Sequence, residues 1–233
     1  MNNKIIIHQD RSIIEIKGDE RKSFIQGLIT NDVNKASETN LIYSAMLNPQ
    51  GRFMYDFFIF EIGDSLIFDC YGPRRDEIFQ KLNFYKLRSK VEIVKNDELI
   101  VAQSFDSDKS YPTEFKDPRH HNLGNRIYFK GEKNDAENSD EYSFLRICNK
   151  VSESEHDLTY EKSFILEFGF DELNAIDYQK GCYVGQELTA RTHYRGEIRK
   201  KLIHIKIDNL QNLQKGGEIS CEGKSVGIVL SSV

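Results

Sequence analysis

Several segments of the chain alternate apolar and polar residues with the period of a β-strand. Residues 12–18, SIIEIKG, show this alternation and end in a glycine. Residues 41–64 hold two apolar runs separated by Asn48-Pro49-Gln50-Gly51, which is typical of a turn because proline pre-sets φ and glycine adopts positive φ. We therefore predict a strand and then a hairpin, followed by strands at 65–70, 90–94 and 98–103.

Other segments repeat apolar residues at helical spacing. Asp19 precedes the first and is a candidate cap, and Pro73 opens the second. Their apolar faces hold Phe24, Ile25, Leu28 and Ile29 in the first segment, and Ile78, Phe79, Leu82 and Tyr85 in the second. We expect further helix near 160–168 and from Gln186 onward. Helices mixed with antiparallel hairpins predict an α+β fold rather than a doubly wound sheet.

The middle and the end of the chain have a different character. Residues 104–141 are polar with one short strand candidate at 126–129, so we predict exposed connections and a lobe boundary there. After Arg199-Lys200-Lys201 the pattern is entirely β, with candidate strands in LIHIKI, EISCEG and SVGIVL. We divide the chain into an α+β region, 1–198, and a C-terminal β segment, 199–233.

Composition narrows the function. The 233 residues carry a net charge of −5, which gives no global signature of nucleic-acid binding. No segment approaches the roughly 20 apolar residues that span a bilayer, and the N-terminus shows no signal peptide. We expect a soluble, intracellular protein. The cysteines at 70, 148, 182 and 221 form no CxxC pair, so neither a disulfide framework nor a self-contained zinc or iron–sulfur site is predicted.

The segment KGCYVGQE, residues 180–187, is the first candidate for chemistry. Lys180 lies two residues before Cys182, and a nearby cation or a helix N-terminus lowers the pKa of a thiol. Gly181 and Gly185 permit a tight turn and a close approach of a ligand to the backbone. The alternative is a structural turn whose cysteine is packed and inert.

Three further features carry polar groups of interest. In a regular strand Asp56 would share an apolar face with Met54 and Phe58, which suggests a site, a partner arginine or an edge strand that faces solvent. Asn31 and Asp32 follow a helical pattern and are suited to capping it. The basic residues of RTHYRGEIRKK could hold an anionic ligand tail or RNA phosphates, or form a solvated helix face.

The stretch KGCYVGQELTARTHYRG resembles the signature of the YgfZ-type folate-binding proteins, which are relatives of the glycine-cleavage T-protein, an aminomethyltransferase. The resemblance spans nearly the whole chain. In the same order as in that family, it includes IKGDERKSFIQGLITNDV, SAMLNPQGRFMYDFFIFE, FYKLRSKVEI, DPRHHNLGNR and SFILEFGFDELNAIDYQ.

The resemblance implies T-protein-like lobes around a central channel, with a small C-terminal β-barrel that is incomplete if it ends at Val233. It implies binding of tetrahydrofolate or a related folate. It further implies support for the synthesis or repair of iron–sulfur clusters in selected enzymes, including tRNA-modifying ones, in the cytoplasm, or in mitochondria for eukaryotic relatives. The expected partners are folate and iron–sulfur client or assembly proteins, with no membrane and no direct nucleic acid.

The same resemblance assigns site residues. Cys182 and Lys180 are the candidate catalytic pair, and no metal ligands are assigned. The candidate folate contacts are Asn31, Asp56, Glu167, Tyr183, Gln186, Glu187, Arg191 and Arg195.

Two alternatives stay open. One is a folate-dependent one-carbon transferase of the T-protein class, although Tyr55-Asp56 keeps only one of the two adjacent acidic residues of T-proteins. The other is a non-catalytic binding module with a structural cysteine.

Overall fold

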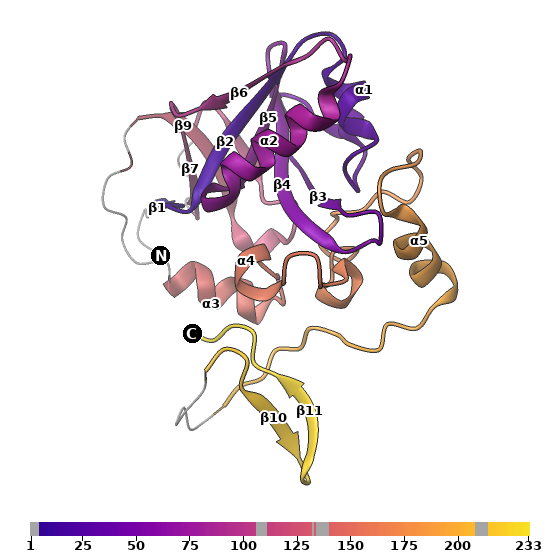
Figure 1. Cartoon of the computed structure of the whole chain (residues 1–233). Coiled ribbons are helices and arrows are strands. Elements are labelled where there is room, and N and C mark those ends of the chain that lie inside the picture. The colour runs from indigo at the N-terminus through magenta and orange to yellow at the C-terminus, as the bar shows by residue number, and fades with distance from the viewer. Residues whose placement is uncertain (1–4, 106–110, 132, 134–139, 208–213) are drawn as a thin grey trace.

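The computed structural model describes residues 5–105, 111–131, 133, 140–207 and 214–233 (Figure 1). It shows a mixed fold of antiparallel sheets with short helices, which confirms the predicted α+β class. Within these residues, no helix combines the length and the apolar character needed to cross a bilayer.

A five-stranded antiparallel sheet forms the centre of the fold, in the order β3-β4-β5-β2-β6. It contains the predicted hairpin, whose strands pair from Ile42 opposite Ile59 to Leu47 opposite Phe53. Its strands are β2 (Arg11–Lys17), β3 (Ile42–Leu47), β4 (Phe53–Ile62), β5 (Ser65–Tyr71) and β6 (Glu92–Asn96).

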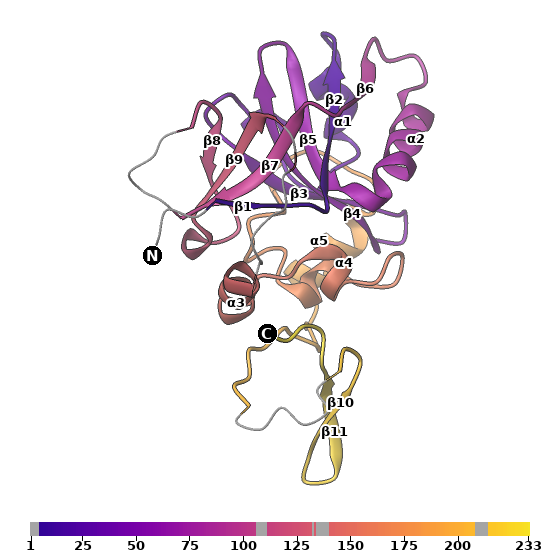
Figure 2. The ribbon, with the colours of Figure 1, turned by 90° about the vertical axis from the view of Figure 1, so that its left-hand side faces the viewer.

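A second antiparallel sheet of four strands, in the order β1-β7-β9-β8, packs against one face of the first (Figure 2). Its strands are β1 (Ile5–Ile7), β7 (Leu99–Ser104), β8 (Glu114–Lys116) and β9 (Asn125–Lys130). Two of them lie in the segment predicted as exposed connections. Strand β9 confirms the strand predicted at 126–129. The connections beside it are not all exposed, because Arg119, which pairs with Asp117, is buried, as is Arg126 on β9.

The helices are short. The α-helices are α1 (Arg21–Gln26), α2 (Arg75–Lys86), α3 (Asp140–Cys148), α4 (Ser154–Asp157) and α5 (Gln186–Arg195). The 3₁₀ helices are η1 (Val33–Lys35), η2 (Gly72–Arg74), η3 (His121–Leu123) and η4 (Ile165–Phe168). Helix α1 begins after Glu20 with no side-chain cap, so the predicted Asp19 cap was wrong. Only the end of the segment near 160–168 is helical.

Two apolar cores lie on opposite faces of the five-stranded sheet. Alternate residues of β4 enter different cores, with Phe58 between the two sheets and Phe57 under the helices. Helices α1 and α2 cover the second core through residues such as Ile25 and Ile78. Because β4 is buried on both faces, it is almost continuously apolar.

The prediction that Asp56 shares one strand face with both Met54 and Phe58 is partly wrong. The register of β3 and β4 shifts beside Met46, so that Leu47 pairs with Phe53 rather than with Met54. This bulge places Met54 in the core under the helices, together with its neighbour Tyr55. Phe53 takes the place expected for Met54, while Phe58 keeps its predicted face.

The C-terminal segment contains a two-stranded sheet of β10 (Glu218–Cys221) and β11 (Lys224–Ile228), and no barrel among the described residues. The predicted strand over 202–207 has no regular structure. Figure 2 shows the hairpin standing apart from the two larger sheets. The C-terminal segment contacts the main body through Ser231, whose Oγ accepts a hydrogen bond from Arg146 and donates one to Asp157.

Candidate functional site

The KGCYVGQE segment is anchored to the end of α1 and the loop that follows it. The Lys180 side chain is buried, and its Nζ donates to the main-chain oxygens of Gln26, Ile29 and Asn31 at 2.7, 2.6 and 2.7 Å. A cation at the C-terminal end of a helix also interacts favourably with the helix dipole. Lys180 therefore holds residues 28–32, LITND, against the KGCYVGQE segment.

The Lys180 ammonium is fully engaged in these hydrogen bonds. An ammonium has three N–H donors, and all three have main-chain acceptors, which leaves none for the Cys182 thiol. Burial lowers the pKa of Lys180 to about 8, while the carboxylates of Asp32 and Asp177 act in the opposite direction. These hydrogen bonds make Lys180 a positioning residue for the loop, and its predicted activation of the Cys182 thiol stays a prediction.

Cys182 is exposed, whereas Lys180 and Tyr183 on either side of it are buried. Its buried neighbours fix the loop, so the thiol is presented to solvent from a defined backbone. This exposure contradicts the alternative of a packed cysteine at this position. By contrast, Cys70 is buried in β5, and burial raises the pKa of its thiol to about 12, which makes it the inert cysteine.

The rest of the motif builds the start of α5. Burial raises the pKa of the Tyr183 hydroxyl to about 12, and Thr189 hydrogen-bonds to it from the helix. Gln186 is half-buried at the first position of α5, and Glu187 is exposed in the first turn, where a carboxylate stabilises the helix dipole. None of these three residues lines the pocket of about 180 Å³ that lies between η4 and α5.

Asn31 is a structural residue. Its side-chain nitrogen donates to the main-chain oxygens of Tyr43 and Asn174, at 2.8 Å each, and its side-chain oxygen accepts from the Asp32 N–H. Asp32 then caps the start of η1 by accepting from the Asn34 N–H, whereas the prediction was that it caps the end of the preceding helix, which ends at Gly27. The Asn31 amide is therefore fully engaged in joining α1 to the chain that precedes KGCYVGQE.

Asp56 is 3% exposed and does not face an open channel. One carboxylate oxygen accepts from the Tyr43 hydroxyl at 2.7 Å, and the other lies 3.7 Å from the Arg11 Nη1 with no hydrogen-bond partner among the described residues. Of the predicted alternatives, pairing with an arginine describes this position best.

A buried charge cluster lies beside Asp56, and sequence patterns gave little signal for it. The Asp69 carboxylate accepts hydrogen bonds from the Nε of Arg11 and the Nε of Arg126 at 2.7 Å each, and from the Tyr128 hydroxyl at 3.0 Å. Burial opposes ionisation of Asp69, but the two guanidinium groups outweigh it and lower the pKa of Asp69 to about 2. The only sequence signal was a carboxylate in an apolar strand.

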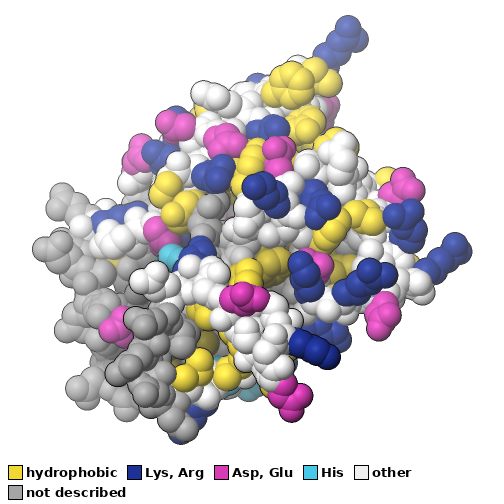
Figure 3. Space-filling view, turned by 60° about the horizontal axis from the view of Figure 1, so that its bottom comes forward, with side chains coloured by type: hydrophobic (Ala, Val, Ile, Leu, Met, Phe, Trp, Pro, Cys, Tyr) yellow, Lys and Arg dark blue, Asp and Glu magenta, His cyan; other side chains and the backbone are white. Residues whose placement is uncertain are grey.

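The remaining predicted residues lie near α5. Glu167 is half-buried and lines a pocket of about 180 Å³ between η4 and α5. Arg191 and Arg195 are exposed on the outer face of α5. In Figure 3, Lys and Arg side chains gather on the side of the molecule where α5 lies.

The predicted folate contacts do not line one cavity in the part of the chain that the structure describes. Asp56 and Asn31 are engaged in the interior, Glu167 lines the pocket of about 180 Å³, and Arg191 and Arg195 point to solvent. Cofactor pockets usually measure about 300–1,000 Å³. Within the described residues, these predicted contacts therefore form no pocket of folate size, and folate binding stays a prediction.

Candidate metal ligands are sparse in the described residues. They contain no group of three His, Cys, Asp or Glu side chains arranged to hold a metal ion. The nearest pair is Cys148 and His204, whose Sγ and Nε2 lie 3.9 Å apart.

Curated relatives share a common description. The chain is 31% identical over 225 residues to the protein named iron-sulfur cluster assembly factor IBA57 homolog, mitochondrial, of Mycosarcoma maydis, covering 84% of this chain and 55% of that one. The proteins of the same name from Pyricularia oryzae and Dictyostelium discoideum are 28% and 29% identical, covering 92% and 84% of this chain and 62% and 61% of theirs. The chain thus spans little more than half the length of these relatives.

The other comparisons add less. No family model matches the chain. The aminomethyltransferase T of the glycine cleavage system from Bartonella henselae superposes with a TM-score of 0.41 at 9% identity, over 48% of this chain and 35% of that one. A likeness of this size supports no statement about fold or function.

Proposed function

We propose that this chain is an iron–sulfur cluster assembly factor that meets its partner protein through Cys182. The observation that carries the proposal is the similarity, over 84% or more of this chain, to proteins whose names give that function. The exposed Cys182 on an anchored loop supplies a group suited to it.

The chemistry follows from the number of available ligands. Clusters of the [2Fe–2S] and [4Fe–4S] types are usually held by four thiolates. Cys182 provides one, so an acceptor or donor protein provides the others while the cluster is shared. The Cys182 thiol releases its proton when the thiolate binds iron, so cluster binding strengthens as pH rises.

Complementation tests the proposal. In a strain that depends on this protein, the activity of an iron–sulfur enzyme is measured after expression of wild type, Cys182→Ser or Cys221→Ser. We expect wild type and Cys221→Ser to restore activity and Cys182→Ser to fail, with all variants folded by circular dichroism. Full activity of Cys182→Ser, or no rescue by wild type, would overturn the proposal.

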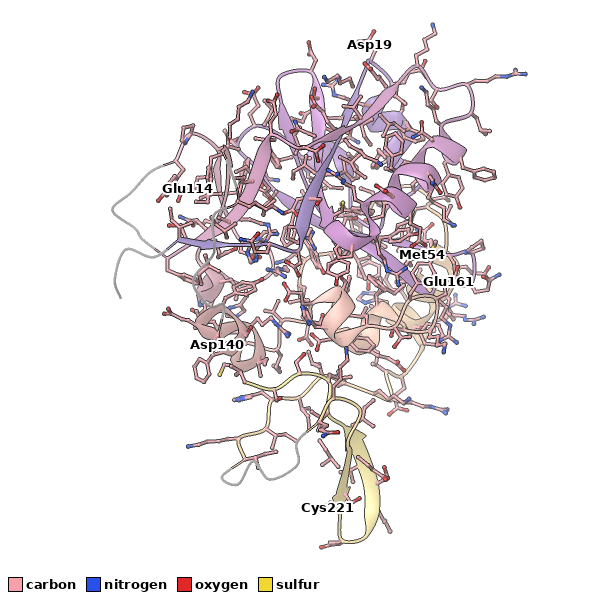
Figure 4. All side chains as sticks on the ribbon, turned by 60° about the vertical axis from the view of Figure 1, so that its left-hand side comes forward. Asp19, Met54, Glu114, Asp140, Glu161 and Cys221 are labelled. Atoms are coloured by element: carbon pink, nitrogen blue, oxygen red, sulfur yellow. The ribbon has the colours of Figure 1, made fainter. Side chains whose placement is uncertain are left out.

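Cys221 is a matched control for this experiment. Like Cys182 it is an exposed free cysteine, so its loss changes the thiol count equally. Figure 4 shows it on the C-terminal hairpin, at the end of the molecule opposite Asp19. An effect specific to Cys182 therefore reports on KGCYVGQE.

The competing function is aminomethyl transfer of the T-protein class. Tyr55 occupies one of the two positions where T-proteins carry adjacent acidic residues, and its hydroxyl donates to Glu77 at 2.6 Å on the helical side of the sheet. Asp56, on the other face, is buried and paired. We expect no turnover with a lipoyl carrier protein and tetrahydrofolate, and robust turnover would favour this alternative.

Three finer expectations stay predictions. Tetrahydrofolate binding is tested by calorimetry on the folded chain, where no heat at high micromolar ligand would reject it. Service to tRNA-modifying enzymes is tested by measuring modified nucleosides in the complemented strain. A cytoplasmic or mitochondrial location is tested by cell fractionation.

A further inference from the structure

The surface that follows Cys182 is basic within an acidic protein. Residues 186–201 contain five Arg or Lys and two acidic residues, a net charge of +3, whereas the whole chain carries −5. All five basic side chains are exposed: Arg191, Arg195, Arg199, Lys200 and Lys201. Such a local field attracts a negatively charged partner and accelerates its association.

Helix α5 presents a particular set of residues to solvent. Arg191, Tyr194 and Arg195 lie at i, i+3 and i+4, so they share one face, and the Tyr194 side chain is 61% exposed. His193 stacks on Tyr178, with ring centroids 3.7 Å apart, and Tyr194 meets Tyr178 edge-on. Tyrosine and arginine are the residue types enriched at the energetic centres of protein interfaces.

A pocket lies beside this helix. Its volume is about 180 Å³, and its wall combines apolar Phe164, Leu166 and Leu188 with Thr192 and Arg199. A cavity of about 150 Å³ can hold benzene, so this pocket suits one apolar side chain. Glu167 and Glu197 also line it, so the pocket has charged residues of both signs beside its apolar wall.

The spacing allows one partner to reach both this surface and the thiol. Cys182 lies four residues before the start of α5, so an extended chain of this length spans at most about 14 Å. Arg191 lies about 8 Å further along the helix axis. A standard protein interface covers about 800 Å² on each partner, which includes both positions.

We propose that the exposed face of α5, the basic residues 199–201 and the adjacent pocket form the docking surface for an acidic protein partner that inserts one apolar side chain. The inference rests on the proposed function, since it names the kind of partner that meets Cys182. A protein fits better than RNA because the pocket is largely apolar and suits a side chain such as leucine, which RNA lacks.

Selection from a displayed library of random twelve-residue peptides tests the proposal. The full chain is the bait, and the charge-reversed variant Arg191→Glu/Arg195→Glu serves for counter-selection. We expect enriched peptides rich in Asp and Glu with one apolar residue. Their affinity should fall at least about tenfold in the charge-reversed variant and in raised salt. Thr192→Phe, which fills the pocket, should weaken the same peptides.

The control is Arg88→Glu/Lys90→Glu, which reverses two exposed basic residues elsewhere and changes the net charge equally. It should bind the peptides like wild type. The proposal is overturned if no peptide enriches, if the enriched peptides lack acidic residues, if both reversals act alike, or if single-stranded polyuridine binds the same surface more tightly. Because peptide binding does not use the thiol, its failure leaves the complementation result for Cys182 standing, and the converse also holds.

Discussion

Gly51 and Gly185 lie back to back, so that the hairpin turn and the KGCYVGQE segment touch through their backbones. Gly185 has a φ of +82° and Gly51 a φ of +72°. A Cβ added to Gly185 would lie 3.1 Å from the Gly51 Cα and 2.5 Å from the Asn48 carbonyl oxygen. The neighbouring Val184 ties the same segment to the end of α1 by donating its N–H to the Gly27 oxygen at 3.0 Å. Any larger residue at position 185 would separate the two segments.

Gly185→Ala should lower the free energy of unfolding by about 2–4 kcal/mol, because a left-handed backbone strains alanine and the added methyl group meets a carbonyl. Urea unfolding measures the change. Gly181→Ala is the control in the same segment, since it has an ordinary φ and no atom within 4 Å of the added Cβ. It should stay within about 0.5 kcal/mol of wild type. Equal losses in both variants would refute the backbone contact.

Lys180→Met should destabilise the protein by roughly 2–4 kcal/mol, because three main-chain oxygens lose a charged donor in a buried place. Hydrogen exchange of the Val184 amide should accelerate, since the loop is then held by fewer contacts. Lys86→Met, at the half-buried end of α2, is the control and should change neither quantity appreciably. Unchanged exchange at Val184 in Lys180→Met would show that the lysine does not hold the loop.

The elements with a local signal were predictable from sequence. The turn at Asn48–Gly51 and the strands on either side follow from proline, glycine and apolar runs, and helix α5 begins at Gln186 as predicted. Family resemblance singled out KGCYVGQE before any contact was visible. These features depend on residues close together in the chain, which is why sequence patterns report them.

The arrangement of the site was not predictable in the same way. Lys180 finds its acceptors about 150 residues earlier in the chain, and Asp69 meets Arg126 across two sheets. Polar residues look exposed in a sequence until a partner elsewhere in the fold satisfies them. Arg119 therefore fell in a predicted exposed connection, although it is buried and donates to the Tyr142 hydroxyl of α3. The bulge that turns Met54 away from Asp56 likewise depends on the register of two strands.

Asp69→Asn should cost about 3–5 kcal/mol, because it leaves two buried guanidinium groups without their carboxylate. The folded pKa of Asp69, about 2, is below its ordinary value of 3.8. Its stabilisation is therefore present above pH 4 and is lost as pH falls through 2. Acid unfolding followed by circular dichroism should shift to higher pH in the variant. Asp64→Asn, at an exposed carboxylate, should not shift the curve.

His8 should make the free energy of unfolding depend on pH at higher pH values than Asp69 does. Burial lowers the pKa of His8 to about 3, and Arg126 and Arg11 add to the effect, whereas Glu153 and Asp69 oppose it. Its Nε2 lies 3.4 Å from the Gln103 side-chain oxygen. Below pH 6.5 the unfolded chain binds a proton that the folded protein excludes. The stabilisation is therefore complete above pH 6.5 and falls by about 1.4 kcal/mol per pH unit toward pH 3.

Urea unfolding between pH 7 and pH 5.5 isolates this term, because Asp69 and Glu153 stay largely ionised there in both states. Their pKa values are about 2 in the folded protein and 3.8 and 4.5 in the unfolded chain. His8→Gln should flatten the slope, since glutamine does not titrate and can still donate to Gln103. His121→Gln, at an exposed histidine, should leave the slope as in wild type. If His8→Gln keeps the full wild-type slope, the buried neutral state of His8 is wrong, and another histidine accounts for the pH dependence.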